Sequence, residues 1–218
     1  MDFRKTSFPP ALFITGIGTD VGKSFATGWL AREMNLAGHK CITQKMIQTG
    51  NGEWSEDIER HRKIMGTDLL PEDRCHLTAP IIFSYPASPH LAATLDGKEI
   101  NLSVVDRASE ALLSVYPHLL IEGAGGLMVP IEDDYLTIDY ICSRNLPVVL
   151  VVTGQLGSVN HALLSLSAIR TYGISLFGVI YNPYFDKDKI ICDDTRAYLK
   201  KWISKHFPTS LWIGMPSL

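Results

Sequence analysis

The stretch "ALFITGIGTDVGKS", residues 11–24, joins a short apolar run to a glycine-rich turn that ends in Gly-Lys-Ser. An apolar run of this length before a turn is typical of a buried parallel strand. Gly16 and Gly18 let the backbone approach a ligand, and the free N–H groups of a following helix attract an anion. The common phosphate loop has four residues between its first glycine and Gly-Lys-Ser/Thr, whereas five separate Gly16 from Gly22. We predict a phosphate-binding turn of unusual spacing; the alternative is a strand-to-helix turn with an exposed lysine.

The rest of the chain repeats this strand-then-helix pattern. Further short apolar runs predict strands at 40–45, 118–122, 148–153, 176–181 and 210–214. Helical spacing of apolar residues predicts helices at 23–37, 103–116, 159–171 and 193–206. Strands that alternate with helices form βαβ units around a parallel sheet, so we predict an α/β fold. The region 48–100 is the least regular and is expected to lie over the sheet edge.

Composition narrows the class of protein. A chain of 218 residues with 46% hydrophobic and 20% charged residues is expected to form one domain, 1–218. The net charge of −3 gives no general reason to expect nucleic acid or an anionic membrane as a partner. The four cysteines form no CxxC pair and have no zinc-site spacing, which favours reduced thiols. With no apolar run of membrane-spanning length, we expect a cytoplasmic protein.

Charged residues follow three of the predicted strands. Lys23 and Ser24 open the first helix, where they suit a terminal phosphate and Mg²⁺. Glu122 ends the strand before "GAGG" and could help to hold Mg²⁺; Lys45 ends the strand before "MIQTG", which contains Thr49. The carboxyl ends of parallel strands share one edge. We therefore predict an anionic reaction centre there, although either strand-end residue could instead be a solvated surface charge.

Taken together, the motifs resemble the dethiobiotin synthetase family. "GIGTDVGKS", "KMIQTG", "PASPH", "EGAGG" and "QLGSVNHALL" occur in the family's order between about residues 11 and 182. The five-residue spacer is the family's form of the phosphate loop. The resemblance implies a P-loop NTPase-like three-layer sandwich, in which a mostly parallel central sheet is flanked by helices.

The resemblance also implies an activity, an ATP-dependent carboxylase that closes a cyclic urea in biotin biosynthesis. The family converts 7,8-diaminononanoate, CO₂ (or bicarbonate) and MgATP to dethiobiotin, ADP and phosphate. The N7 amine captures CO₂ as a carbamate, which attacks the γ-phosphate to give a carbamic-phosphoric anhydride. The second amine then displaces phosphate. Family members are homodimers with sites at the interface.

The resemblance also implies roles for the residues that match the family's motifs. The catalytic residues would be Lys23, Lys45 and Thr49. Nucleotide contacts would come from Gly18, Thr19, Asp20, Val21, Gly22, Lys23, Ser24, Phe25, Glu122, Gly125 and Asn182. The diamine would meet Lys45, Thr49, Ser88 and Pro89, with its carboxylate at the partner subunit's helix start, formed by the segment Gly157, Ser158, Val159 and Asn160. Mg²⁺ would meet Ser24, Asp57 and Glu122, although Glu56 is an alternative to Asp57.

The sequence departs from the family pattern at two points. Met46 follows Lys45 where the family usually has proline, so the strand-end turn is expected to differ. Relatives often continue beyond the Gly-x-Pro motif with a tail that covers the base, whereas this sequence has only "SL" after Pro216. The choice of ATP over other nucleotides is therefore left open.

Three other classes of protein share parts of this pattern. A partitioning-type ATPase switch usually carries a lysine five residues before the P-loop lysine, where this chain has Gly18. The synthetase half of a cobyrinate-type amidase shares the fold but works with a glutaminase domain, for which we recognise no Cys-His arrangement. A small-molecule kinase would have an arginine-rich lid, whereas Arg60, Arg62 and Arg74 are scattered through a mixed-charge stretch. An ordinary helix cap at Ser158 is the alternative for "GSVNHA".

Overall fold

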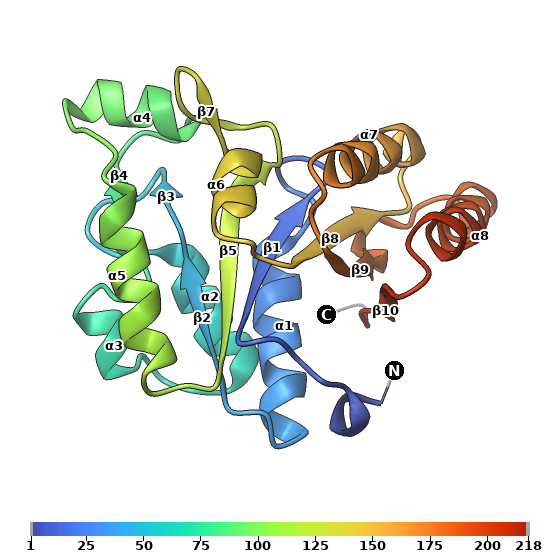
Figure 1. Ribbon diagram of the computed structural model, residues 1–218, viewed down its shortest axis with the longest axis horizontal. Coiled ribbons are helices and arrows are strands. Elements are labelled where there is room, and N and C mark those ends of the chain that lie inside the picture. The colour runs from blue at the N-terminus through green and yellow to red at the C-terminus, as the bar shows by residue number, and fades with distance from the viewer. Residues whose placement is uncertain (1, 217–218) are drawn as a thin grey trace.

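A computed structural model of the chain describes residues 2–216 and is built around a six-stranded parallel sheet (Figure 1). From one edge to the other the strands are β10 (Leu211–Gly214), β9 (Leu176–Asn182), β8 (Val148–Thr153), β1 (Ala11–Gly16), β5 (His118–Gly126) and β2 (Cys41–Lys45). All five strand pairs are parallel. The sequence predicted all six strands, with bounds that differ mainly at β5, which continues through the glycine turn to Gly126.

Both faces of this sheet are buried, because alternate residues of its central strands enter two separate hydrophobic clusters. On β1, Phe13 packs on one face, while Leu12 and Ile14 pack on the other. Side chains of successive strand residues point to opposite faces, so continuous apolar runs are what a sheet covered on both sides requires. The apolar run at 148–153 divides between the two clusters in the same way.

Helices form the two outer layers. α1 (Lys23–Leu36) covers one face, and α2 (Glu56–Met65) packs against α1. The opposite face carries α4 (Pro89–Asp96), α5 (Leu102–Leu113), α6 (Thr137–Ser143), α7 (Ser158–Thr171) and α8 (Lys189–His206) (Figure 1). The result is a helix–sheet–helix sandwich, as the sequence predicted. The predicted helices correspond to α1, α5, α7 and α8, whereas α6 was not anticipated.

The region 48–100 is more regular than its sequence indicated. Besides α2 and α4 it contains α3 (Pro71–Arg74) and the paired two-residue strands β3 (Gln48–Thr49) and β4 (Ile82–Phe83). α2 escaped detection because the side chains that it buries are Ile58, His61 and Arg62, so its inner face is largely polar. Apolar periodicity cannot reveal such a helix, although Ser55, whose hydroxyl accepts a hydrogen bond from Ile58 N at 3.2 Å, is a recognisable cap.

Short elements complete the described chain. They are the 3₁₀ helices η1 (Phe3–Lys5) and η2 (Pro183–Phe185) and the antiparallel pair β6 (Pro130–Glu132) and β7 (Tyr135–Leu136). Within residues 2–216, no helix is both long and apolar enough to span a membrane.

Candidate active site

The glycine turn joins β1 to α1 at the carboxyl edge of the sheet. Its backbone takes left-handed conformations at Asp20 (φ 57°) and Gly22 (φ 86°). A side chain is strained at such a φ, and a Cβ at Gly22 would also lie 2.2 Å from the Asn182 amide nitrogen. Lys23 folds back over the turn, where its Nζ donates a hydrogen bond to the Gly18 carbonyl at 2.9 Å. The turn thus presents backbone N–H groups and a lysine around one concave point.

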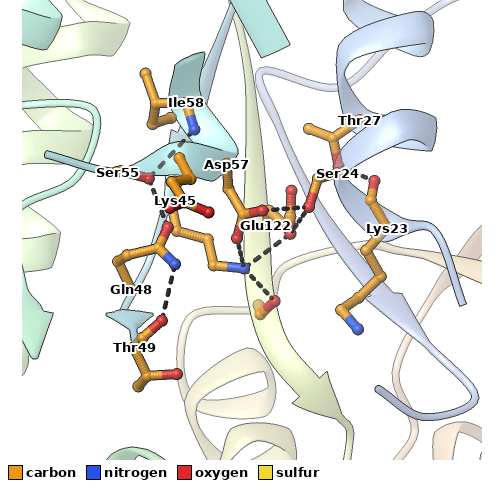
Figure 2. Close-up of polar contacts among 12 residues, drawn as sticks. Lys23, Ser24, Thr27, Lys45, Gln48, Thr49, Ser55, Asp57, Ile58 and Glu122 are labelled. Atoms are coloured by element: carbon orange, nitrogen blue, oxygen red, sulfur yellow. Dashed lines mark hydrogen bonds and ion pairs between the residues drawn. The ribbon is translucent and has the colours of Figure 1, made fainter. Parts of the chain in front are cut away.

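Beside the turn, side chains from four elements converge. Figure 2 shows Ser24 of α1, Asp57 of α2, Glu122 of β5 and Lys45 of β2 pointing toward one another. The Ser24 hydroxyl lies 2.7 Å from Asp57 Oδ1 and 2.9 Å from Glu122 Oε1. Lys45 Nζ lies 2.7 Å from Asp57 Oδ2 and 2.8 Å from Glu122 Oε1. β2 and β5 are neighbours in register, with Lys45 opposite Glu122, which places both residues at the same edge.

Burial and ion pairing set the charges of this group. Burial alone would lower the pKa of Lys45, but the carboxylates of Glu122 and Asp57 outweigh it and hold that pKa above its usual value. Burial would raise the pKa of Glu122, yet Lys45 and the hydrogen bond from His61 hold it well below its usual range. Burial lowers the pKa of Lys23 to about 8, because its carboxylate neighbours compensate only in part. Lys45 is therefore a firmly charged ammonium, whereas Lys23 is buried at a cost that an anionic ligand would relieve.

These groups line one end of a cavity of about 850 Å³. Of the residues predicted from the sequence, the cavity wall contains Thr19, Asp20, Gly22, Lys23, Ser24, Phe25, Lys45, Thr49, Asp57, Ser88, Pro89, Glu122, Gly125 and Asn182. A volume of this size suits a nucleotide together with a small second substrate. Asp57 contacts Ser24, whereas its neighbour Glu56 is solvent-exposed, so the geometry favours Asp57 as the carboxylate at this point.

The remaining predicted residues lie outside the cavity wall. The carbonyls of Gly18 and Val21 accept hydrogen bonds from Lys23 and Asn182. The segment 157–160 forms the start of α7, and its role toward a partner's substrate stays a prediction. Ser158 does not act as the side-chain cap of α7; its hydroxyl is 2.7 Å from the hydroxyl of Thr153.

Asn182 joins the cavity wall to the glycine turn. Its Nδ2 donates to the Val21 carbonyl at 3.0 Å, and its Oδ1 accepts from Tyr184 N at 3.1 Å. One amide hydrogen remains for a ligand. Tyr184 and Phe185 of η2, which line the same cavity, were not predicted from the sequence. The aromatic pair directly after Asn182 in "YNPYF" is the signal that could have found them.

Sequence reasoning also missed three basic residues of α2. Arg60 reaches the cavity wall and stacks its guanidinium over the Phe25 ring, 5.3 Å from its centroid. Arg62 is fully buried and donates two hydrogen bonds of 2.8 Å to Asp73. His61, also fully buried, contacts Glu122 Oε2 at 2.7 Å. The helical turn from Asp57 to His61 brings Arg60 and His61 beside the site, whereas Arg62 lies buried behind it.

Comparison with known proteins places this chain in a family. Residues 10–206 match the model of a protein family described as an AAA domain. The chain is 44% identical to ATP-dependent dethiobiotin synthetase BioD 2 of Pasteurella multocida, over 92% of this chain and 94% of that protein. It is 48% identical to the protein of the same name from Haemophilus influenzae, over 85% of this chain and 97% of that protein.

A solved structure supports the fold independently of close sequence similarity. The signal recognition particle receptor FtsY from Elizabethkingia anophelis, in complex with GDP, superposes with a TM-score of 0.50 at 14% identity. The match covers 96% of this chain and 57% of the receptor chain, and at that identity it bears on the fold alone. The sheet, the glycine turn with Lys23 and the extent of similarity to the curated relatives lead to one conclusion: the chain belongs to the ATP-dependent dethiobiotin synthetase family.

Proposed function

We propose that the protein makes dethiobiotin from 7,8-diaminononanoate, CO₂ and ATP. The observation that carries the proposal is the buried Lys45 ammonium at the end of a cavity that also contains the phosphate turn. Both reacting groups, a carbamate and a γ-phosphate, are anions, so their approach requires concentrated positive charge. Lys23, Lys45 and the N–H groups of the turn supply that charge.

Lys45 has a defined part in this scheme. An ammonium has three donors, and those of Lys45 face Asp57, Glu122 and the Gly123 carbonyl. The contact to Gly123, at 3.3 Å, is the longest and would be exchanged for a carbamate oxygen. Thr49, together with Ser88 and Pro89 of the same cavity wall, would hold the diamine. The carbamate oxygen attacks the γ-phosphate, and the bond from that phosphate to ADP breaks. The second amine then attacks the carbamate carbon and loses a proton, the C–O bond to phosphate breaks, and phosphate leaves.

We further propose that Ser24, Asp57 and Glu122 hold Mg²⁺. A hydroxyl has one hydrogen, yet Ser24 Oγ lies within 2.9 Å of both carboxylates, and a cation would relieve the oxygen–oxygen contact left without a hydrogen. Within residues 2–216 there is no group of three His, Cys, Asp or Glu suited to a metal. Mg²⁺ commonly uses one or two carboxylates and takes its other ligands from phosphate and water, so the donor set fits. When bound, the ion would neutralise charge on the β- and γ-phosphates.

We also propose that residues 1–218 act as one domain and that two copies pair through the start of α7. Large apolar side chains are exposed on α7 or near it: Leu156 by 86%, Leu164 by 62% and Met128 by 54%. Met128 and Leu164 line a second cavity, of about 340 Å³, together with His161. Leu164→Glu should yield a monomer by sedimentation analysis and a raised KM for the diamine. The matched control is Leu36→Glu, because Leu36 is also exposed but ends α1. A Leu164→Glu variant that remains a dimer contradicts this interface.

The need for ATP and the four free cysteines support a cytoplasmic location, which we propose as well.

The decisive experiment is a direct assay. Purified protein with MgATP, bicarbonate and 7,8-diaminononanoate should form dethiobiotin, detected by mass spectrometry, and parallel reactions with CTP and GTP measure nucleotide choice. Absence of product at millimolar diamine with every nucleotide contradicts the proposed function.

A further inference from the structure

Glu122 has a partner on each of its carboxylate oxygens, and the two oxygens face different surroundings. Oε1 faces the cavity, where it meets Lys45 and Ser24. Oε2 faces the protein interior, where it meets His61 Nε2 at 2.7 Å. Neither Glu122 nor His61 has exposed surface, so no solvent competes for this contact.

The hydrogen bonds behind His61 run in one direction. Arg62 Nη1 is always a donor and lies 2.9 Å from Thr43 Oγ1. Thr43 Oγ1 lies 3.0 Å from His61 Nδ1. Among the residues that the structure describes, Thr43 Oγ1 has no third partner, so its single hydrogen must point to Nδ1. The proton of the imidazole then lies on Nε2, directed at Glu122.

Arg62, the first donor in this series of hydrogen bonds, is held in place by its own partners. Its guanidinium forms a bidentate pair with Asp73, and Asp73 also accepts from Leu70 N at 2.7 Å and from the Thr78 hydroxyl at 2.7 Å. Asp73 is buried, and the hydrogen bonds and charge of Arg62 hold its pKa below its usual value despite burial. Arg62 therefore cannot move without separating the buried charges of its pair with Asp73.

We propose that His61 is a positioning residue: the series Arg62–Thr43–His61 fixes the carboxylate plane of Glu122, so that Oε1 is presented to the metal and to Lys45. The proposal rests on the Mg²⁺ site proposed above. Without His61, Oε2 would lie buried without a partner, and the carboxylate would rotate to find one in the cavity, away from the orientation that Ser24 and Asp57 share. Groups that hold a ligating side chain in place typically change metal affinity by about 10–100-fold when they are lost.

The experiment compares three substitutions of His61. His61→Leu removes both hydrogen bonds. His61→Gln can place an amide N–H near the position of Nε2 and so keep the bond to Glu122. His61→Asn can reach only the position of Nδ1 and so keeps the bond to Thr43. The control is His39→Leu, which removes a histidine whose Nε2 lies 2.9 Å from Phe3 O, outside the cavity wall.

The main readout is binding of Mn²⁺, in place of Mg²⁺, to protein with a non-hydrolysable ATP analogue, followed by electron paramagnetic resonance. His61→Leu and His61→Asn should weaken Mn²⁺ binding by about 10–100-fold, whereas His61→Gln should recover most of it and His39→Leu should match the wild type. Analogue binding without metal should be alike in all variants. If His61→Leu does not fold, the difference in Mn²⁺ affinity between His61→Gln and His61→Asn tests the proposal.

Two outcomes overturn different statements. Equal Mn²⁺ affinity in the Gln, Asn and wild-type proteins contradicts the role of His61 while leaving the metal site intact. Absence of Mn²⁺ binding by the wild-type protein contradicts the metal site itself.

Discussion

Replacement of Lys45 by Met should destabilise the protein, whereas the same replacement of Lys23 should not. Lys45 Nζ is the ammonium that contacts both Asp57 and Glu122, and its side chain is 6% exposed. Removal of one partner from a buried ion pair costs about 3–5 kcal/mol, because the remaining charge is left unpaired. For a chain of this length, 1 kcal/mol shifts Tm by about 2–4 °C, so Lys45→Met should lower Tm by roughly 6–20 °C at pH 7.

Lys23→Met is the matched control, because Lys23 is buried in the same cavity and its Nζ contacts the carbonyl of Gly18. Its pKa falls from 10.5 to about 8 on folding, which corresponds to a cost of about 3 kcal/mol at pH 7. A lowered lysine pKa means that the unfolded chain binds more protons between pH 8 and 10.5, so wild-type stability should rise over that interval relative to Lys23→Met. At pH 7 this variant should melt at or above the wild-type temperature, while losing nucleotide affinity.

The raised pKa of Lys45 gives stability the opposite dependence on pH. Its contribution to stability is fully present below the ordinary lysine value and is lost as pH rises through the folded value. The Tm deficit of Lys45→Met should therefore stay constant between pH 7 and 9. Thermal melts followed by circular dichroism, without nucleotide or metal, measure all three proteins. A Tm for Lys45→Met within 2 °C of the wild type would refute the reasoning, because it would mean that Asp57 and Glu122 do not depend on this ammonium.

Four further substitutions test other parts of the site. Glu122→Gln should raise the Mg²⁺ concentration for half-maximal turnover about tenfold or more, because it removes a charged ligand; an unaltered metal titration excludes it from the metal site. In the same Mg²⁺ titration, Asp57→Asn should raise the half-maximal Mg²⁺ concentration to a similar degree, whereas Glu56→Gln should not change it. The reverse result would make Glu56, and not Asp57, the metal ligand. Arg62→Met should lower stability by about 3–5 kcal/mol in urea unfolding, because Asp73 is left buried and unpaired; a loss below 1 kcal/mol would show that this pair is replaceable.

The sequence by itself determined the sheet and the positions along it where chemistry could occur. Six apolar runs became the six strands, because burial on both faces requires continuous apolar residues and leaves a simple pattern. Lys23, Lys45 and Glu122 could be grouped in advance, since the carboxyl ends of neighbouring parallel strands must share an edge. The motif "GIGTDVGKS" did not indicate the family alone, but together with "EGAGG" and "QLGSVNHALL" it did.

Tertiary structure alone decided what surrounds those residues. α2 buries a histidine and an arginine beside a single isoleucine, so no hydrophobic period marks it. Its place against α1 brings Asp57 into contact with Ser24 and leaves Glu56 exposed. The bond from His61 to Glu122 joins residues 61 positions apart in the chain. Such a contact depends on the packing of a polar helix face against a strand end, and periodicity and spacing carry no information about it.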